Sequence, residues 1–130
     1  MIVNDLISDM LIRINNGYNS KLISVKVLYS KICLKILALL YSEGYINGYY
    51  LTNDGMIIVK LKYHLNNNIF KGYQRISKPS RKVYYSAKEL KQKFYNKPFV
   101  VVSTINGLLL HRYAILKNIG GEVLFVLSYM

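Results

Sequence analysis

The chain has 130 residues, which suits one compact unit or two very small subdomains, and its 52% hydrophobic content supports a buried core and excludes a disordered chain. Eighteen Lys and Arg face six acidic residues, and this net charge of +12 indicates a polyanionic partner, nucleic acid before an anionic membrane surface. Cys33 is the only cysteine, which excludes an internal disulfide, and no apolar run reaches the roughly 18 residues of a membrane span.

Two helices are predicted in the first half of the chain. Asn4 and Asp5 are good helix-start residues, and the apolar residues that follow them recur at helical spacing. Gly17 stands where a glycine would end this helix as its C-cap. Ser30 can cap a second helix, and Gly44 is expected to end it.

Strands are predicted around these helices. Residues 23–27 alternate between apolar and polar types, as in a short strand. Residues 45–52 and 56–63 are strand-like and flank Asn53-Asp54-Gly55, which is a strong hairpin signal. Polarity peaks at the three asparagines of residues 66–68, so the boundary between two subdomains is expected there.

The second half of the chain is predicted to be mostly β. Residues 69–77 are expected to form a strand that breaks before Pro79, and Ser86 and Glu89 form a capping box for a helix that ends near Phe94. The other predicted elements are a short strand at 83–85, a buried strand at 99–104, a turn at 105–107, a strand at 108–110, one or two helical turns at 111–117, and a last strand at 123–127.

These elements predict an α+β fold of two small subdomains. Residues 1–68 form an α-β-α-β-β subdomain, and residues 69–130 form a mostly β subdomain with a short helix. The charge is uneven, because residues 1–68 carry seven basic and four acidic side chains, net +3, whereas residues 69–130 carry eleven basic and two acidic ones, net +9. The second subdomain is therefore expected to carry more of the contact with a polyanion.

Seven segments resemble, in order and in spacing, the family of ribosomal protein eight of the small subunit, in its bacterial and organellar form. They are ISDMLIRINNG at 7–17, YSK at 29–31, SEGYI at 42–46, QRISKP at 74–79, VY at 83–84, VVST at 101–104 with Gly107, and GGEV at 120–123. The resemblance covers nearly the whole chain. It implies a two-domain α+β protein without enzymatic activity that binds the central domain of small-subunit rRNA early in assembly and contacts neighbouring ribosomal proteins.

The family's main RNA-binding loop has the sequence Ser-Thr-Ser-Lys-Gly after a buried strand. Ser103, Thr104 and Gly107 match its first, second and last positions. Hydroxyl groups both donate and accept hydrogen bonds, so they suit base edges and ribose 2′-hydroxyls, although these residue types are also common in plain turns. Ile105 and Asn106 replace a Ser and a Lys, so we expect one base contact and one charge to be lost, while Asn106 keeps a polar contact with RNA.

The family's C-terminal turn lies beside this loop and is matched by Gly120, Gly121 and Glu122. A carboxylate there can accept a hydrogen bond from a base amino group or orient neighbouring hydroxyls, or it can be a solvated turn acid. Tyr84 belongs to the basic stretch 71–97 and is the candidate for stacking on a base, although a tyrosine on a strand is more often part of the core.

Six further positions are assigned to RNA by the resemblance: Arg13, Ser30, Lys31, Ser77, Lys78 and Pro79. The hydroxyl of Ser30 and the helix N-terminus beside it suit a phosphate group, but a solvated helix face would look the same in sequence. After Pro79, Ser80 stands where the family usually has Gly, and near Arg13, Asn15 stands where the family commonly has Arg.

Other function classes are less favoured. A non-ribosomal basic module that binds nucleic acid without sequence preference is the alternative, and a peripheral membrane protein would need a basic amphipathic helix, whereas the first helix carries Asp5 and Asp9. We expect no enzyme, cofactor, metal or small-molecule substrate. The sequence around Ser103 lacks the pattern of a nucleophile elbow, and the spacing of Cys33 and the two histidines is not that of metal ligands.

The composition also bears on where the protein works. Abundant Tyr, Lys, Asn and Ile, with no Trp, are typical of an A+T-rich gene, and the first five residues lack the layout of a signal or transit peptide. We therefore expect a ribosome in the mitochondrial matrix and an organelle-encoded gene. A plastid-type organelle and a bacterial cytoplasm are the alternatives.

Overall fold

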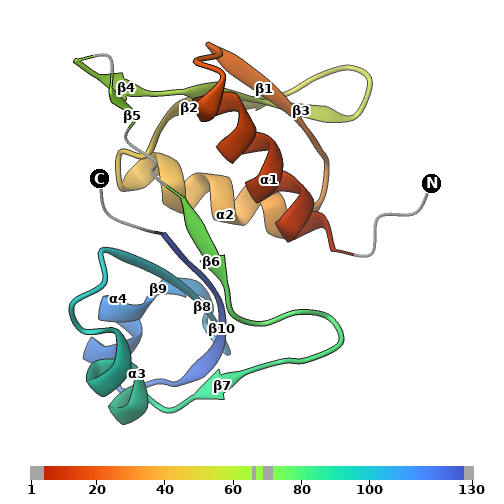
Figure 1. The fold of residues 1–130 in the computed structure, drawn as a ribbon. Coiled ribbons are helices and arrows are strands. Elements are labelled where there is room, and N and C mark those ends of the chain that lie inside the picture. The colour runs from red at the N-terminus through yellow and green to blue at the C-terminus, as the bar shows by residue number, and fades with distance from the viewer. Residues whose placement is uncertain (1–4, 66, 69–71, 128–130) are drawn as a thin grey trace. The chain divides into compact units, whose positions relative to one another are not determined.

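The computed structural model describes residues 5–65, 67–68 and 72–127, which belong to two compact units, residues 1–71 and residues 72–129 (Figure 1). The predicted boundary between residues 68 and 69 adjoins residues 69–71, which lie outside the described residues, as does part of the strand predicted at 69–77. The α+β class is confirmed.

The first unit has the predicted α-β-α-β-β order. Its elements are α1 (Leu6–Asn19), β1 (Ser24–Leu28), α2 (Lys31–Ser42), β2 (Ile46–Leu51) and β3 (Met56–Leu61), followed by the short pair β4 (Tyr63–His64) and β5 (Asn67–Asn68). The strands form an antiparallel sheet in the order β1-β3-β2. The predicted hairpin joins β2 and β3, and Gly55 in its turn has a φ of +79°, which glycine adopts readily.

Both predicted helix caps of the first unit are present. The carboxylate of Asp5 accepts a hydrogen bond from the Ser8 amide at 3.2 Å, and the Ser30 hydroxyl accepts one from the Cys33 amide at 3.0 Å. Each cap satisfies an amide that has no partner within the helix.

Gly17 does not end α1, so the prediction of a C-cap is wrong. The helix continues to Asn19, and a Cβ atom on Gly17 would lie only 2.3 Å from Cγ1 of Val25 and 3.0 Å from Cδ1 of Leu61. Glycine is needed at this position because the helix packs closely against β1 and β3.

The second unit consists of a sheet and two helices. Its elements are β6 (Tyr73–Arg75), β7 (Tyr84–Tyr85), α3 (Ala87–Phe94), β8 (Phe99–Thr104), β9 (Gly107–Leu110), α4 (His111–Leu116) and β10 (Gly121–Leu127). The sheet is antiparallel in the order β6-β10-β8-β9, and β7 also pairs with β10. The predicted capping box starts α3, with Ser86 and Glu89 each accepting a hydrogen bond from the other's amide.

Helices α3 and α4 lie together on one side of this sheet (Figure 1). The core between them and the sheet consists of Leu90, Phe94, Val100, Val102, Ala114, Val123 and Val126. Successive side chains of a strand point to opposite faces. Ser103 and Glu122 adjoin the buried Val102 and Val123, and they therefore project from the sheet face that α3 and α4 do not cover.

Candidate nucleic-acid interface

A row of three polar side chains crosses three strands of the second unit. Tyr84 on β7 pairs with Glu122 on β10, and Glu122 pairs with Ser103 on β8. Directly paired residues of antiparallel strands point to the same face, so the phenol ring, the carboxylate and the hydroxyl lie side by side. Tyr84 is 64% exposed, while Glu122 and Ser103 are partly buried.

This row has the chemistry of base recognition. An exposed aromatic ring offers a stacking surface, a carboxylate accepts hydrogen bonds from base amino groups, and a hydroxyl can donate or accept. Sequence reasoning selected Tyr84, Ser103 and Glu122, and the strand register places them next to one another.

The turn after β8 is stabilised by hydrogen bonds between its own residues. The Thr104 hydroxyl donates to the Gly107 carbonyl oxygen at 2.8 Å and accepts from the Asn106 amide at 3.1 Å. Gly107 has a φ of +100°, which side chains rarely allow. The hydroxyl proton of Thr104 is therefore used in a hydrogen bond within the turn. The side chain that projects from the turn is that of Ile105, which is 92% exposed. Asn106 beside it is exposed as well.

Gly120 and Gly121 allow the strands that carry the row to approach one another closely. A Cβ atom on Gly120 would lie 2.4 Å from the carbonyl oxygen of Tyr85, and one on Gly121 would lie 2.3 Å from the carbonyl oxygen of Ser103. Both glycines are therefore needed because the backbones of β7, β8 and β10 approach closely here. The structure thus gives these two residues a packing role, and the RNA contacts that the sequence resemblance implies for them stay a prediction.

A loop between β6 and β7 is closed by Ser77. This side chain is fully buried, and its hydroxyl accepts from the Val83 amide at 2.8 Å and donates to the Val83 carbonyl at 3.2 Å. Lys78 and Arg81 exchange backbone hydrogen bonds of 2.9 and 3.0 Å within the loop. The buried Ser77 hydroxyl therefore closes the loop, and a contact of Ser77 with RNA stays a prediction.

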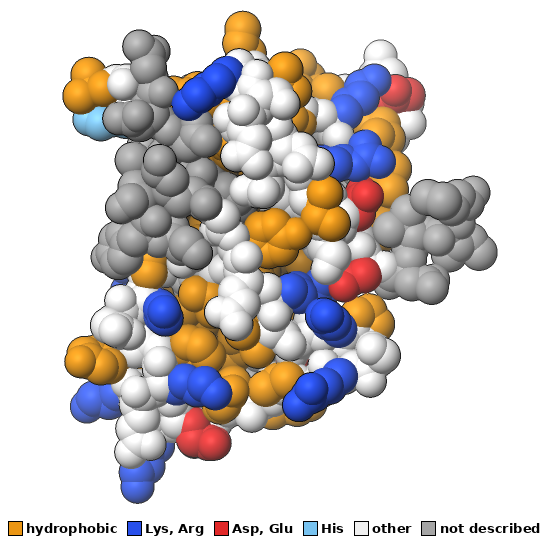
Figure 2. Space-filling view, viewed as in Figure 1, with side chains coloured by type: hydrophobic (Ala, Val, Ile, Leu, Met, Phe, Trp, Pro, Cys, Tyr) orange, Lys and Arg blue, Asp and Glu red, His pale blue; other side chains and the backbone are white. Residues whose placement is uncertain are grey.

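The same loop presents basic side chains. Lys78, Arg81 and Lys82 are exposed, as is Pro79, and within residues 72–127 none of these cations forms an ion pair with a carboxylate. Figure 2 shows Lys and Arg side chains over the unit that contains β7 and α3. Sequence reasoning missed Arg81 and Lys82 as individual residues, although the basic stretch 71–97 includes both.

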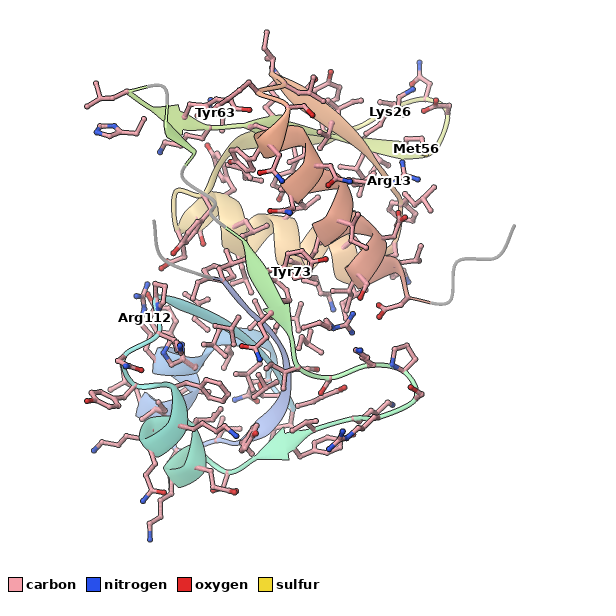
Figure 3. All side chains as sticks on the ribbon, viewed as in Figure 1. Arg13, Lys26, Met56, Tyr63, Tyr73 and Arg112 are labelled. Atoms are coloured by element: carbon pink, nitrogen blue, oxygen red, sulfur yellow. The ribbon has the colours of Figure 1, made fainter. Side chains whose placement is uncertain are left out.

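The three predicted contacts in the first unit have different surroundings. Nε of Arg13 lies 3.0 Å from the Asp9 carboxylate, and its Nη1 donates to the Lys26 carbonyl at 3.1 Å, so this side chain fastens α1 to β1 (Figure 3). The Ser30 hydroxyl accepts the capping hydrogen bond from Cys33. Lys31 is exposed at the start of α2 and forms no ion pair within the described part of this unit.

The described residues contain neither a membrane-spanning helix nor a cluster of metal-ligating side chains. Their helices are all too short or too polar to span a bilayer. Nor do three or more His, Cys, Asp or Glu side chains among them gather closely enough to hold a metal ion.

The chain matches known proteins along nearly its full length. The model of the family described as Ribosomal protein S8 matches residues 5–127. Proteins described as "Small ribosomal subunit protein uS8" from Rickettsia canadensis (strain McKiel) and Rickettsia rickettsii (strain Sheila Smith) are 41% and 42% identical to the chain. Each alignment spans 128 residues and covers 95% of this chain and 97% of the relative.

Proposed function

The chain belongs to the ribosomal protein S8 family, and from this membership we infer that it is a structural constituent of the small ribosomal subunit that binds the central domain of small-subunit rRNA. It is not an enzyme, and its work is recognition and the ordering of RNA during assembly. Because the relatives match it almost from end to end, a non-ribosomal basic module is the less favoured alternative.

The row Tyr84–Glu122–Ser103 is the observation that carries the proposed RNA site. We propose that an unpaired or splayed-out base stacks on the ring of Tyr84 while Glu122 accepts a hydrogen bond from its amino group. Ser103 then binds the base edge or a 2′-hydroxyl. A partly buried carboxylate would repel a phosphate, so this row suits a base and not the RNA backbone.

Affinity is proposed to come from basic side chains around this row. Lys78, Arg81 and Lys82 stand on a loop that Ser77 holds in place, so they are positioned for phosphate groups without neutralising partners of their own. Cations that neutralise phosphates release counterions, and binding through them weakens steeply as salt rises. In the first unit, Lys31 and the start of α2 are proposed as a further phosphate contact.

The tip of the β8–β9 turn sets this chain apart from the family pattern. Ile105 offers no hydrogen bond through its side chain, and Asn106 carries no charge. We propose that Ile105 packs on the apolar face of a base or ribose. Other contacts within the ribosome, including those with neighbouring proteins, then compensate for the binding free energy that the missing polar contacts would have contributed.

A titration of the purified chain tests the proposal. It should bind its cognate central-domain rRNA fragment at least about tenfold more tightly than an unrelated hairpin, at both low and high salt. Ser103→Ala and Glu122→Gln should each lower this preference by about 1–3 kcal/mol. Ser24→Ala is the matched control, because Ser24 is an exposed strand serine of the first unit. Equal binding of both RNAs, with affinity that collapses at higher salt, would refute specific recognition.

The composition of the chain supports a proposal about the compartment in which its ribosome lies. We propose a mitochondrial ribosome, supported by a composition typical of an A+T-rich gene. Mass spectrometry of small subunits from purified mitochondria should detect the chain. Detection in plastid or bacterial ribosomes alone would contradict the mitochondrial assignment.

A further inference from the structure

The outer face of α3 carries a second group of side chains suited to nucleic acid. Lys88, Lys91, Gln92 and Tyr95 follow one another at spacings of three, one and three residues, and they line one surface hollow of about 560 Å³. Residues three, four and seven apart lie on the same side of a helix. The hollow is largely open to solvent, so a bound group would contact it from one side, as a base stacked on a surface ring does.

This face points away from the row Tyr84–Glu122–Ser103. The inner face of α3 is buried in the core through Leu90 and Phe94, against the sheet face opposite the row. The second unit therefore has two separate groups of polar side chains, one on the sheet face opposite α3 and α4 and one on its helical side.

The hollow combines charge with an unused aromatic ring. Lys88 and Lys91 are exposed and form no ion pair within residues 72–127, since the nearby Glu89 is held in the capping box. Lys93, in contrast, donates to the Tyr85 hydroxyl and lies over its ring, so its ammonium group is already engaged by β7. Tyr95 is 75% exposed and makes no ring contact in the described part of the chain.

We propose that this α3 surface binds an unpaired nucleotide of a second RNA segment, so that the second unit holds two RNA segments on opposite sides. Tyr95 stacks on the base, the amide of Gln92 reaches the base edge, and Lys88 and Lys91 contact the flanking phosphates. An acidic peptide would occupy the lysines but leave the tyrosine ring without a role, which is why RNA is the proposed occupant. The inference rests on the proposed rRNA binding.

The test compares two RNAs, the complete central-domain fragment and the shortest hairpin that the wild type distinguishes from unrelated RNA. Lys88→Ala with Lys91→Ala should weaken binding to the complete fragment only and lower its salt slope by about 1.4, or about 0.7 for each single-stranded phosphate contact. Tyr95→Ala should cost about fivefold or more on the complete fragment, and Tyr95→Phe should restore binding because the ring is kept.

Lys35→Ala with Lys60→Ala is the matched control, since it removes two exposed charges from the first unit. The proposal is overturned if the α3 variants bind the complete fragment like the wild type, or if they lose no more affinity than this control. It is also overturned if the hairpin is weakened equally. If the wild type distinguishes no fragment of the central domain from unrelated RNA, the proposed function itself is refuted.

A second measurement locates the RNA directly. A Gln92→Cys variant can be labelled selectively with an iron-EDTA group, because the other cysteine, Cys33, is buried. In reconstituted small subunits, the tethered iron should cleave an rRNA segment outside the hairpin. Cleavage within the hairpin alone, or no cleavage of rRNA, would overturn the proposal.

Discussion

Replacing Gly121 by Ala should push β8 and β10 apart at the centre of the polar row. The added Cβ atom would lie 2.3 Å from the carbonyl oxygen of Ser103 and 3.0 Å from its carbonyl carbon. An ordinary contact begins near 3.4 Å, so the two backbones must separate by about 1 Å. The neighbouring atoms belong to a strand paired on both sides, and they cannot rotate away as a side chain would.

The magnitude follows from two opposing terms. Overpacking in a close-packed region costs about 1–3 kcal/mol, and a backbone neighbour places this substitution at the upper end, about 3 kcal/mol. Alanine also restricts the unfolded chain more than glycine does, which offsets about 0.4–1 kcal/mol. The free energy of unfolding should therefore fall by about 2 kcal/mol.

Urea unfolding followed by circular dichroism measures this loss, and an unchanged slope against urea shows that only stability changed. Gly48→Ala is the matched control on strand β2, because a Cβ atom there meets nothing within 4 Å. The control should be neutral or slightly more stable. In RNA titrations Gly121→Ala should also lose preference for the cognate fragment, since it displaces Ser103 relative to Glu122.

A Gly121→Ala variant as stable as the Gly48→Ala control would refute the close approach of the strands. A variant that loses stability but keeps full RNA preference would show that the geometry of the row does not determine specificity. The two results thus separate the packing argument from the recognition argument.

Three further predictions concern the supports of the fold. Ser77→Ala should lower the free energy of unfolding in urea by about 1–2 kcal/mol, because the buried Val83 amide loses its hydrogen-bond partner. The variant should also bind RNA more weakly, because the basic loop is no longer closed. An unchanged free energy of unfolding together with unchanged RNA affinity would contradict this. Gly17→Ala should destabilise by about 1–2 kcal/mol despite the helix propensity of alanine, since its Cβ meets Val25, and a stability gain would refute the close packing of α1 against β1. Burial, and then the charge of Arg112, lowers the pKa of His111, so the folded protein keeps this imidazole neutral while the unfolded chain takes a proton near pH 6.5. Stability should therefore be full above that pH and fall as the pH is lowered toward 5, and His111→Gln should flatten this dependence; equal slopes for both proteins would contradict it.

Local signals in the sequence were sufficient for most of the elements, although the short pair β4 and β5 was not predicted. The caps at Ser30 and Ser86 depend on side chains and amides three residues apart, so a short stretch of sequence contains the whole interaction. The hairpin at residues 53–55 is local in the same way, because its turn needs a glycine at a positive φ. These features, the α+β class and the basic second half followed directly from the sequence.

The structural roles of several residues, candidate site residues among them, depend on contacts between distant parts of the chain. Glycine has no side chain to show its role, and Gly17 and Gly121 are required by atoms of Val25 and Ser103 that approach them in space. Ser77 was indistinguishable in sequence from an exposed turn serine, and only the packing around it shows that its hydroxyl is enclosed.

The sequence by itself determined the helices, the hairpin, the family and the identity of the polar residues that we propose for RNA binding. The tertiary structure decided which of them lie together. Pairing of β7, β10 and β8 sets Tyr84, Glu122 and Ser103 in one row, although they are far apart along the chain. The physical reason is that strand register arises from the sum of many hydrogen bonds and buried contacts across the sheet, whereas a sequence pattern records only each strand's own preference.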